Sequence, residues 1–433
     1  MFSIPYGKTQ IEFELPDDMH GVVAEPRPVK PLASVRDSIE EALNHPVNSP
    51  PIEELAKPGH RICIVFTDIT RHSPDRLFIP ALLRRLESAG VRDRDIVLLC
   101  GIGMHRASTT EEKITKLGKE VVDRFRVVDN EPQNPAALMD LGESEEGIPL
   151  SVNRIAYETD LLIATGIVEP HQYAGYSGGR KTLAIGAAGE AMIEYTHGPG
   201  MVDHPGTRLG MTEGNPFHQA ITLAARRAGL RFIINAVQDG SGRPVSVMAG
   251  EPEATFEALV GVAREFYEVP VPRQYDVAVA GVGSPKDDNL YQASRAASYL
   301  FFAPTPVVRE GGVIIIPAPT PEGVGHGVGE RRFLEKMKQA QDLPSFLDRM
   351  RREGYPPGAQ RAYVMAKVLE KNTVVIVGSQ TPDVVRRLQM VPARDMQEAF
   401  SMAARMMGRK DLEVLIIPNA LLTLPIVQED QGR

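Results

Sequence analysis

The segment 171–181 (HQYAGYSGGRK) combines a histidine, a glycine-rich turn and a lysine, and His197 follows sixteen residues after Lys181. Glycines allow backbone N–H groups to approach a phosphate, and the side chains of Ser177, Arg180 and Lys181 can supplement them. Imidazole carries protons near neutral pH. These residue types predict an anion or cofactor site, against the alternative of a tight turn with solvated basic residues.

Two other loops also place polar residues after an apolar run that is typical of a buried strand. The run 61–66 precedes Asp68 and Arg71, the run 95–100 precedes His105, and the run 160–167 precedes His171. In open parallel sheets, ligands bind beyond the carboxyl ends of the strands. We therefore expect the three loops to converge on one crevice, although each residue alone could cap a helix or lie on the surface.

Several common cofactor-binding and metal-binding motifs are incomplete or absent in this sequence. Residues 175–182 (GYSGGRKT) nearly match a phosphate-binding P-loop, but Arg180 stands where that motif needs a glycine, so we reject an ATPase. Gly281 and Gly283 follow a predicted strand, but the third glycine of a dinucleotide fingerprint is missing. Neither HExxH nor CxxC occurs, which makes a zinc site a weak interpretation.

Composition limits the class of protein. A chain of 433 residues predicts two domains, and the net charge of −8 without a long basic stripe argues against nucleic acid as a partner. No apolar run approaches the roughly 20 residues of a membrane helix, and no secretory signal is recognisable, so we expect a cytoplasmic protein without membrane contact. Cys63 and Cys100 lie in apolar runs and are interpreted as core residues.

Apolar strands alternate with amphipathic helices along the chain, which predicts an α/β fold of two domains, each a mainly parallel sheet flanked by helices. We place an N-terminal domain at 1–270, a proline-rich linker at 269–272 and a C-terminal domain at 275–419. The apolar tail 420–433 is expected to pack back on the N-terminal domain, and the active site to lie in the cleft between the domains. Ser73 is expected to cap the helix that begins at Pro74.

At this point the chain resembles the nickel-pincer lactate racemase family over nearly its whole length. The matching elements are Asp68-x-Thr70-Arg71, Gly103-x-His105-Arg106, the block from His171 to Lys181, His197-Gly198, Asn215-Pro216-Phe217-His218 and Tyr291-Gln292. The spacings of ten residues from His171 to Lys181 and sixteen from Lys181 to His197 match as well. The resemblance implies a racemase or epimerase of 2-hydroxy acids. It also implies a cofactor, a nickel-pincer nucleotide (a pyridinium-3,5-bisthiocarboxylate mononucleotide holding Ni(II)), and proteins that synthesise this cofactor as partners.

The resemblance also implies residue roles. Lys181 matches the lysine that bonds covalently to the cofactor, His197 the nickel ligand, and His105 and His171 the acid/base pair. The remaining cofactor contacts are Asp68, Ile69, Thr70, Arg71, Ser177, Gly178, Gly179 and Arg180, and the substrate contacts are Arg71, Tyr291, Gln292 and Arg295. A positive neighbour such as Arg180 is expected to lower the pKa of Lys181, which favours attachment.

Two departures bear on the substrate. Lactate-specific members carry a lysine where this chain has Arg295, and the chain contains no tryptophan, so the pocket wall near Tyr355 must differ. Arginine and lysine bind carboxylates differently. Lactate, malate, an aryl lactate or a sugar acid are all open as substrates. The alternatives to this function are a cofactor-free lyase or isomerase that uses His105 and His171, and a non-enzymatic binder of phosphorylated nucleotides.

Overall fold

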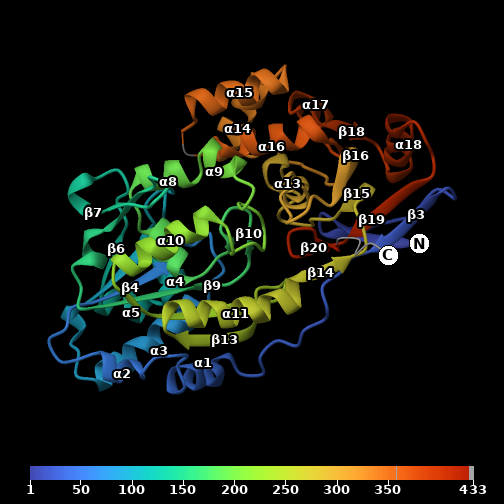
Figure 1. The fold of residues 1–433 in the computed structure, drawn as a ribbon. Coiled ribbons are helices and arrows are strands. Elements are labelled where there is room, and N and C mark those ends of the chain that lie inside the picture. The colour runs from blue at the N-terminus through green and yellow to red at the C-terminus, as the bar shows by residue number, and fades with distance from the viewer. Residues whose placement is uncertain (357, 429–433) are drawn as a thin grey trace. The chain divides into compact units, whose positions relative to one another are not determined.

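The computed structural model describes residues 1–356 and 358–428, and it divides into two compact units. The central unit contains residues 28–197 and 212–266, whereas the terminal unit contains residues 1–27, 198–211 and 267–433. Each unit is a mainly parallel sheet flanked by helices, as predicted (Figure 1). Residues 429–433, the end of the predicted tail, lie outside the described part of the chain.

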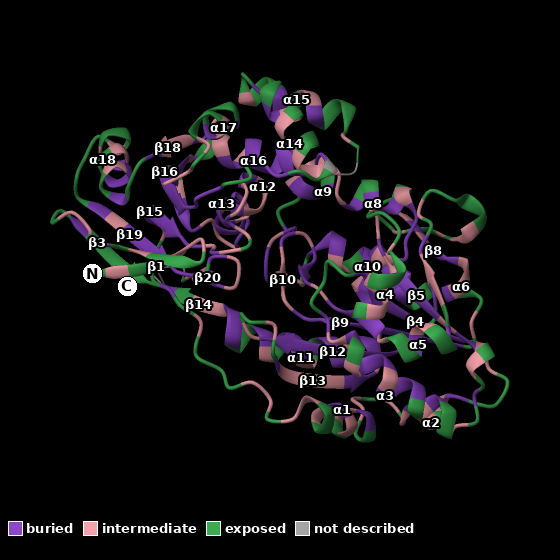
Figure 2. Cartoon of the chain, turned by 180° about the vertical axis from the view of Figure 1, so that it is seen from behind, coloured by how far each residue is buried: buried purple, intermediate pink, exposed green. Residues whose placement is uncertain are grey.

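The sheet of the central unit has the strand order β13-β12-β9-β4-β5-β6, and only the β12–β13 pair is antiparallel. The strands are β4 (Ile62–Thr67), β5 (Ile96–Gly101), β6 (Arg126–Asp129), β9 (Leu161–Ile167), β12 (Leu230–Gln238) and β13 (Pro244–Gly250). All six residues of β4 and all seven of β9 are buried (Figure 2). A parallel strand with helices on both faces needs such a continuous apolar run.

Alternate residues of β4 face the two helical layers of the central unit. Ile62, Ile64 and Phe66 share a core with residues of α1, α2, α3 and α5. The strand also contacts α6 and the π-helical turn η3. The helices of this unit are α1 (Val35–Asn44), α2 (Ile52–Leu55), α3 (Asp75–Ser88), α4 (Thr110–Leu117), α5 (Lys119–Arg124), α6 (Arg154–Tyr157), α7 (Gly179–Lys181), η3 (Thr182–Gly186), α8 (Glu190–Thr196), α10 (Pro216–Arg227) and α11 (Pro252–Tyr267). Local signals set several of their starts: Ser34 and Asn215 cap α1 and α10, and Thr109 forms a reciprocal capping box at α4.

The sheet of the terminal unit has the order β18-β17-β16-β15-β19-β3, and every pair in it is parallel. Its strands are β3 (Met19–Val23), β15 (Tyr275–Ala280), β16 (Val308–Pro317), β17 (Thr373–Val377), β18 (Val391–Ala393) and β19 (Leu412–Ile417). Its helices are α9 (Pro199–Asp203), α12 (Leu290–Ala293), α13 (Arg295–Phe301), α14 (Val328–Lys338), α15 (Leu343–Glu353), α16 (Gln360–Lys371), α17 (Pro382–Arg387) and α18 (Met396–Met407).

Short antiparallel ribbons and a small parallel pair complete the described part of the chain. The ribbons are β1 (Phe2–Tyr6) with β2 (Thr9–Phe13), β7 (Leu138–Glu143) with β8 (Pro149–Asn153), and β10 (Pro170–His171) with β11 (Gly175–Tyr176). The parallel pair joins β14 (Glu268–Val271) to β20 (Leu424–Val427). Short 3-10 turns occur at η1 (Asp93–Asp95) and η2 (Pro135–Ala137). None of the described helices is both long and apolar enough to cross a bilayer.

Two local interpretations of the sequence are wrong. The proline-rich segment predicted as a linker forms strand β14, whose partner β20 supplies the hydrogen bonds of a two-stranded pair. Proline is tolerated there because a two-stranded pair leaves one edge of each strand outside the ladder. Ser73 does not cap α3: its hydroxyl donates to the Asp75 carboxylate at 3.0 Å, and the helix begins after Pro74 without a side-chain cap.

The N-terminal hairpin β1–β2 covers the carboxyl ends of the strands in the terminal unit. A Cβ on Gly281, just after β15, would lie 2.4 Å from Cγ1 of Ile4 and 2.2 Å from the carbonyl oxygen of Pro418, just after β19. The Tyr6 hydroxyl donates to the carbonyl of Gly378, just after β17, at 2.6 Å. The glycine after β15 therefore accommodates the chain's own hairpin.

Candidate functional site

The loops after β4 and β9 diverge at the switch point of the central sheet. The chain passes from β4 outward to β5 and β6, and β9 then pairs with the opposite edge of β4. A crevice forms where neighbouring strands feed loops in opposite directions, and ligands of open α/β sheets bind there. The loop after β4 carries Asp68 and Arg71, and the loop after β9 carries His171. Two of the three predicted loops thus flank one switch point.

The loop after β5 carries His105, whose side chain contacts Asp68 on the loop after β4. Nδ1 of His105 lies 2.6 Å from Oδ2 of Asp68, whose other oxygen accepts a hydrogen bond from the Thr70 hydroxyl at 2.6 Å. Burial alone would raise the pKa of Asp68, but the hydrogen bonds from His105 and Thr70 outweigh it and hold that pKa below its ordinary value. The carboxylate is buried and the His105 side chain is half exposed. An ionised Asp68 fixes a proton on Nδ1 of His105, so Nε2 of the neutral ring carries the lone pair.

His171 has the opposite arrangement of its ring nitrogens. Its Nδ1 accepts hydrogen bonds from the backbone amides of Tyr173 and Ala174, at 3.2 and 3.1 Å. A nitrogen that accepts from N–H groups must present a lone pair, so the proton of the neutral ring lies on Nε2. The neutral imidazoles of His105 and His171 are therefore complementary, because one can accept a proton at Nε2 and the other can donate a hydrogen bond from it.

Lys181 ends α7 and is partly buried. Burial and, to a smaller extent, the positive charge of Arg71 lower the pKa of its amine to about 7, against the opposing effect of the carboxylates of Glu169 and Asp68. A lysine with such a pKa is substantially neutral, and hence nucleophilic, at neutral pH. The neighbouring charge that acts on Lys181 is that of Arg71. The expectation that Arg180 plays this part is wrong, because its side chain is engaged elsewhere.

His197 follows α8 and is held by that helix. Its Nδ1 lies 3.0 Å from the carbonyl oxygen of Ile193, which can only accept, so Nδ1 donates and Nε2 carries the lone pair. Burial, assisted by the positive charge of Lys181, lowers the pKa of His197 to about 4. The ring packs edge-on against Tyr173 and Phe217, with centroids 5.3 and 5.2 Å away. A neutral imidazole oriented by a backbone carbonyl is the usual state of a histidine that ligates a metal.

The glycine-rich turn packs tightly under the site. A Cβ on Gly178 would lie 2.9 Å from the Phe256 ring, and one on Gly179 would lie 3.0 Å from Ile233. The Ser177 hydroxyl donates to the carbonyl of Ile167 at 2.7 Å, so it stabilises the loop itself. The glycines here serve close packing between the turn and the sheet.

Arg180 lies on the other side of the turn and is 4% exposed. Its guanidinium donates to the Thr222 hydroxyl at 2.8 Å and lies 4.2 Å from the centre of the Phe256 ring. Burial lowers its pKa to about 10. His218, 3.5 Å from the same guanidinium, has a pKa lowered to about 4 by burial and by that charge. These contacts give Arg180 a place in the packing of α7 against α10 and α11.

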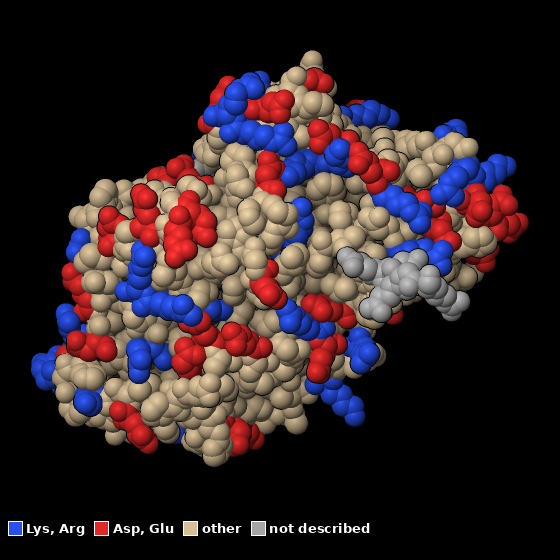
Figure 3. All heavy atoms as spheres, in the orientation of Figure 1, with Lys and Arg blue, Asp and Glu red and all other residues tan. Residues whose placement is uncertain are grey.

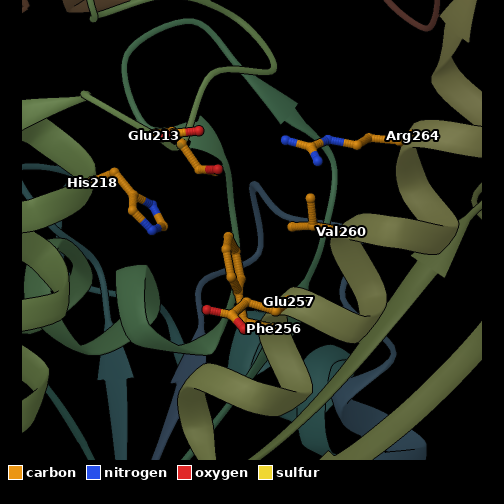
Figure 4. A pocket seen from close by; sticks show the side chains of 7 residues that line it. Glu213, His218, Phe256, Glu257, Val260 and Arg264 are labelled. Atoms are coloured by element: carbon orange, nitrogen blue, oxygen red, sulfur yellow. The ribbon is translucent and has the colours of Figure 1, made fainter.

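A cavity of about 320 Å³ lies beyond this layer and is not lined by His105, Lys181 or His197. Figure 4 shows His218, Phe256 and Arg264 directed into it, with Glu213 and Glu257 at its margin. The carboxylates and Arg264 are exposed, so the cavity opens to solvent. Its lining does not coincide with the convergent histidines and lysine, and the candidate site therefore remains the switch point.

The remaining predicted residues belong to the loops already described or to the terminal unit. Ile69, Thr70 and Arg71 are exposed on the loop after β4. Tyr291, Gln292 and Arg295 lie at α12 and α13 of the terminal unit and are partly buried. Arg295 donates to Gln292 Oε1 at 3.3 Å and to the Tyr299 hydroxyl at 2.8 Å, which restrains its guanidinium.

Several residues hold these groups in place: Asn215 belongs to a motif of the resemblance that carried no assigned role, whereas Asp75 and Lys116 were not identified from the sequence. Asn215 is fully buried, caps α10 and donates to the carbonyl of Tyr173 at 2.8 Å, which supports the loop that carries His171. Asp75 and Lys116 form a buried ion pair beneath the loop after β4. A polar residue at a helix start and a lysine on an amphipathic helix are common on protein surfaces, so their types alone gave no signal.

The central unit thus carries two histidines of complementary tautomer, a nucleophilic lysine and a third, neutral histidine on the loops around one sheet edge. This is an α/β protein of two units with a candidate catalytic site in one of them. Two family models match the chain: the lactate racemase N-terminal domain over residues 6–210 and the lactate racemase C-terminal domain over residues 272–424. The chain belongs to the lactate racemase family.

Individual relatives agree with this family. The lactate racemase of Thermoanaerobacterium thermosaccharolyticum is 31% identical over 421 residues, covering 96% of this chain and 97% of the relative. The lactate racemase of Lactiplantibacillus plantarum is 31% identical over 425 residues, covering 96% and 98%. The structure of the lactate racemase apoprotein from Thermoanaerobacterium thermosaccharolyticum has a TM-score of 0.85 at 30% identity, covering 99% of both chains. A crystal structure of a Thermotoga maritima protein shares the fold, with a TM-score of 0.65 at 20% identity over 91% of this chain and 98% of that one.

Proposed function

We propose that this protein is a racemase or epimerase of small 2-hydroxy acids, with a nickel-pincer nucleotide attached to Lys181 and His197 as the protein's nickel ligand. Membership of the lactate racemase family gives the class of reaction. The observation that carries the proposal is the pair of complementary imidazoles: His105 presents a lone pair at Nε2, whereas His171 presents a proton there. Such a reaction needs one group that takes up the hydroxyl proton and one that hydrogen-bonds the carbonyl oxygen formed, and the two imidazoles suit these tasks near neutral pH.

The donor chemistry of the site supports such a cofactor. The described residues hold no group of three or more His, Cys, Asp and Glu side chains that could bind a metal, so a single imidazole needs further donors from the cofactor. Sulfur, carbon and imidazole donors in one plane suit nickel(II). His197 is neutral, with its lone pair on Nε2, and the lowered pKa of Lys181 makes its amine a competent nucleophile for attachment.

The protein's own residues would then divide the work as follows. Lys181 and His197 would hold the cofactor, which would supply a reversible hydride acceptor for the alpha carbon of the substrate. His105 takes the hydroxyl proton at Nε2, and the adjacent Asp68 carboxylate stabilises the imidazolium that results. His171 would donate a hydrogen bond from Nε2 to the oxygen of the 2-oxo acid, and the proton held by His105 would return to that oxygen when the hydroxyl re-forms. Arg71, exposed on the same loop as Asp68, can bind the substrate carboxylate bidentately.

The terminal unit would contribute to substrate choice through Tyr291, Gln292 and Arg295. The guanidinium of Arg295 is restrained by Gln292 and by Tyr299, so it can offer a fixed donor to a polar substituent of the substrate. We propose a small-molecule 2-hydroxy acid as substrate and the cofactor-synthesis proteins as functional partners. Basic and acidic side chains are interspersed over the face in Figure 3, an arrangement that suits recognition within a site more than binding to a polyanion.

The proposal is tested on protein made in cells that also synthesise the cofactor. Intact mass should show a covalent adduct on Lys181 and metal analysis should show nickel, and a screen of lactate, malate, phenyllactate and gluconate should find racemisation or epimerisation. His105→Ala and His171→Ala should abolish turnover and keep nickel, whereas His197→Ala should lose nickel. Turnover by unmodified, nickel-free protein would instead establish a cofactor-free lyase or isomerase, and an adduct without turnover would indicate a nucleotide-binding protein.

A further inference from the structure

An ion pair buried beneath the loop after β4 is not part of the proposed chemistry. Asp75 is 0% and Lys116 6% exposed, and Nζ of Lys116 lies 3.1 Å from Oδ2 of Asp75. Removing two charges from water costs several kcal/mol for each ion, and such a pair often stabilises a fold no better than apolar residues of the same size. The role of this ion pair must therefore be inferred from the hydrogen bonds that Asp75 and Lys116 make with neighbouring residues.

Asp75 ties the ends of two neighbouring strands together. Its carboxylate accepts hydrogen bonds from the hydroxyls of Thr67 at 2.8 Å and Thr165 at 2.5 Å. Thr67 is the last residue of β4 and Thr165 belongs to β9, the two strands that form the switch point. Ser73, at the far end of the loop, donates to the same carboxylate at 3.0 Å. The two ends of the loop are thus fastened to one buried group.

Lys116 fastens the middle of the loop through its backbone. Its ammonium donates to the carbonyl of Arg71 at 2.6 Å and to that of Ser73 at 3.2 Å. The buried side chain of Gln238 donates to the intervening carbonyl of His72 at 2.9 Å. Three consecutive carbonyls of a loop that is otherwise exposed are therefore bonded from below, which limits the positions that the side chain of Arg71 can reach.

We propose that Asp75 and Lys116 are positioning residues for the site, which hold Arg71 and the Asp68–His105 pair in their working geometry. Asp68 directly follows Thr67, so the hydrogen bond from Thr67 to Asp75 fixes the backbone from which the Asp68 carboxylate reaches His105. The inference rests on the proposed function for its effect on turnover. Its effect on the loop itself can be measured without any turnover.

The decisive variant replaces both charges at once, as Asp75→Leu with Lys116→Met. The double variant avoids a buried unpaired charge, but it leaves three hydroxyls and two carbonyls without their charged partner, so we expect Tm to fall in a protein that still folds. Amide exchange of residues 68–73 should become faster in the cofactor-free protein. In the loaded enzyme, kcat should fall roughly 10- to 100-fold and KM should rise, the order expected when reacting groups are misplaced by about 1 Å.

A matched control is available on the same helix. Lys113 pairs with Asp129 at 2.7 Å, and this pair is also largely buried, but it joins α4 to β6. Lys113→Met with Asp129→Leu should leave exchange of residues 68–73 and kcat at wild-type levels. If the Asp75/Lys116 variant does not fold, Thr67→Val removes a single hydroxyl and should give a smaller change in the same direction.

The outcomes separate this inference from the proposed function. Unchanged exchange of residues 68–73 in the Asp75/Lys116 variant, or in Thr67→Val, would overturn the positioning role. An equal change in the Lys113/Asp129 control would also overturn it, because any buried pair on α4 would then do the same. Wild-type protein that carries no adduct and turns over no 2-hydroxy acid would defeat the proposed function, and the exchange result would still decide the role of the pair.

Discussion

Replacing Asp68 by Asn should slow catalysis strongly while leaving the fold intact. The carboxylate is buried and keeps its charge at neutral pH, because the hydrogen bonds from His105 and Thr70 hold its pKa below the ordinary value in spite of burial. Asn keeps the size and can still accept from Thr70, but it removes the negative charge that faces Nδ1 of His105. The imidazolium formed during proton transfer then loses its counter-charge.

The magnitude follows from the 2.6 Å contact between Asp68 Oδ2 and His105 Nδ1. A hydrogen bond to a charged group contributes roughly 1.5–3 kcal/mol, and about 1.4 kcal/mol in the barrier changes a rate tenfold, so kcat should fall about 10- to 150-fold. Coupled measurement of racemisation in both directions gives kcat and KM for each enantiomer. The loss should appear mainly in kcat, because the contact strengthens as charge develops on His105.

The pH dependence of the unfolding free energy tests the contact between Asp68 and His105 independently. Folding lowers the pKa of Asp68, so its contribution to stability is present above the unfolded-state pKa of about 4 and is lost as the pH falls through the folded-state value. The acid limb of the unfolding free energy should be shallower in Asp68→Asn. Asp160→Asn, which breaks a partly exposed pair with Arg61, is the matched control for kcat. A variant Asp68→Asn with wild-type kcat would refute the assigned state of His105.

Three further predictions concern other parts of the chain. Acylation of Lys181 in the cofactor-free protein should reach half its maximal rate near pH 7. Arg71→Met should move this midpoint to higher pH, because it removes a positive charge that lowers the pKa of Lys181. Peptide mass spectrometry, with surface lysines as reference, measures both rates. Gly281→Ala should destabilise the protein by about 1–3 kcal/mol, because the added Cβ would clash with Pro418 and Ile4. Gly261→Ala should stabilise it slightly, because this glycine lies in α11 and an added Cβ would meet no other atom. Thermal unfolding, reported as Tm, measures both changes. Thr109→Ala should lose about 1 kcal/mol in urea unfolding, because it removes the side-chain bond of the capping box.

The fold was largely predictable because its strands are buried on both faces. Such strands are continuous apolar runs, as in 62–67 and 161–167, and they stand out from amphipathic helices without any knowledge of pairing. Pairing over long separations was not predictable. Strand β3 joins β19 across nearly the whole chain, and the proline-rich segment at 268–271 becomes a strand only because β20 lies beside it.

The candidate residues of the site could be named from the sequence, whereas the groups that hold them in place could not. His105, His171 and Lys181 lie on loops and turns that follow strands, and two histidines with a lysine at neighbouring strand ends are typical of a site that moves protons. The partners of His105 and Lys181 come from distant segments, Asp68 and Arg71. The pKa of Lys181 depends on Arg71, which lies 110 positions earlier in the sequence, and not on the adjacent Arg180, whose side chain packs on Phe256. Spacing identifies candidates for chemistry, but only the fold decides which charges they meet.

The two sheets show why the same topology yields one candidate site and not two. Each sheet has a switch point, between β4 and β9 in the central unit and between β15 and β19 in the terminal unit. At the first, the loops carry Asp68 and His171; at the second, Ile4 of the N-terminal hairpin lies against Gly281 and Pro418. A crevice filled by a fully buried isoleucine cannot also admit a nucleotide. The incomplete glycine fingerprint after β15 is therefore a packing feature, and the candidate site lies in the central unit.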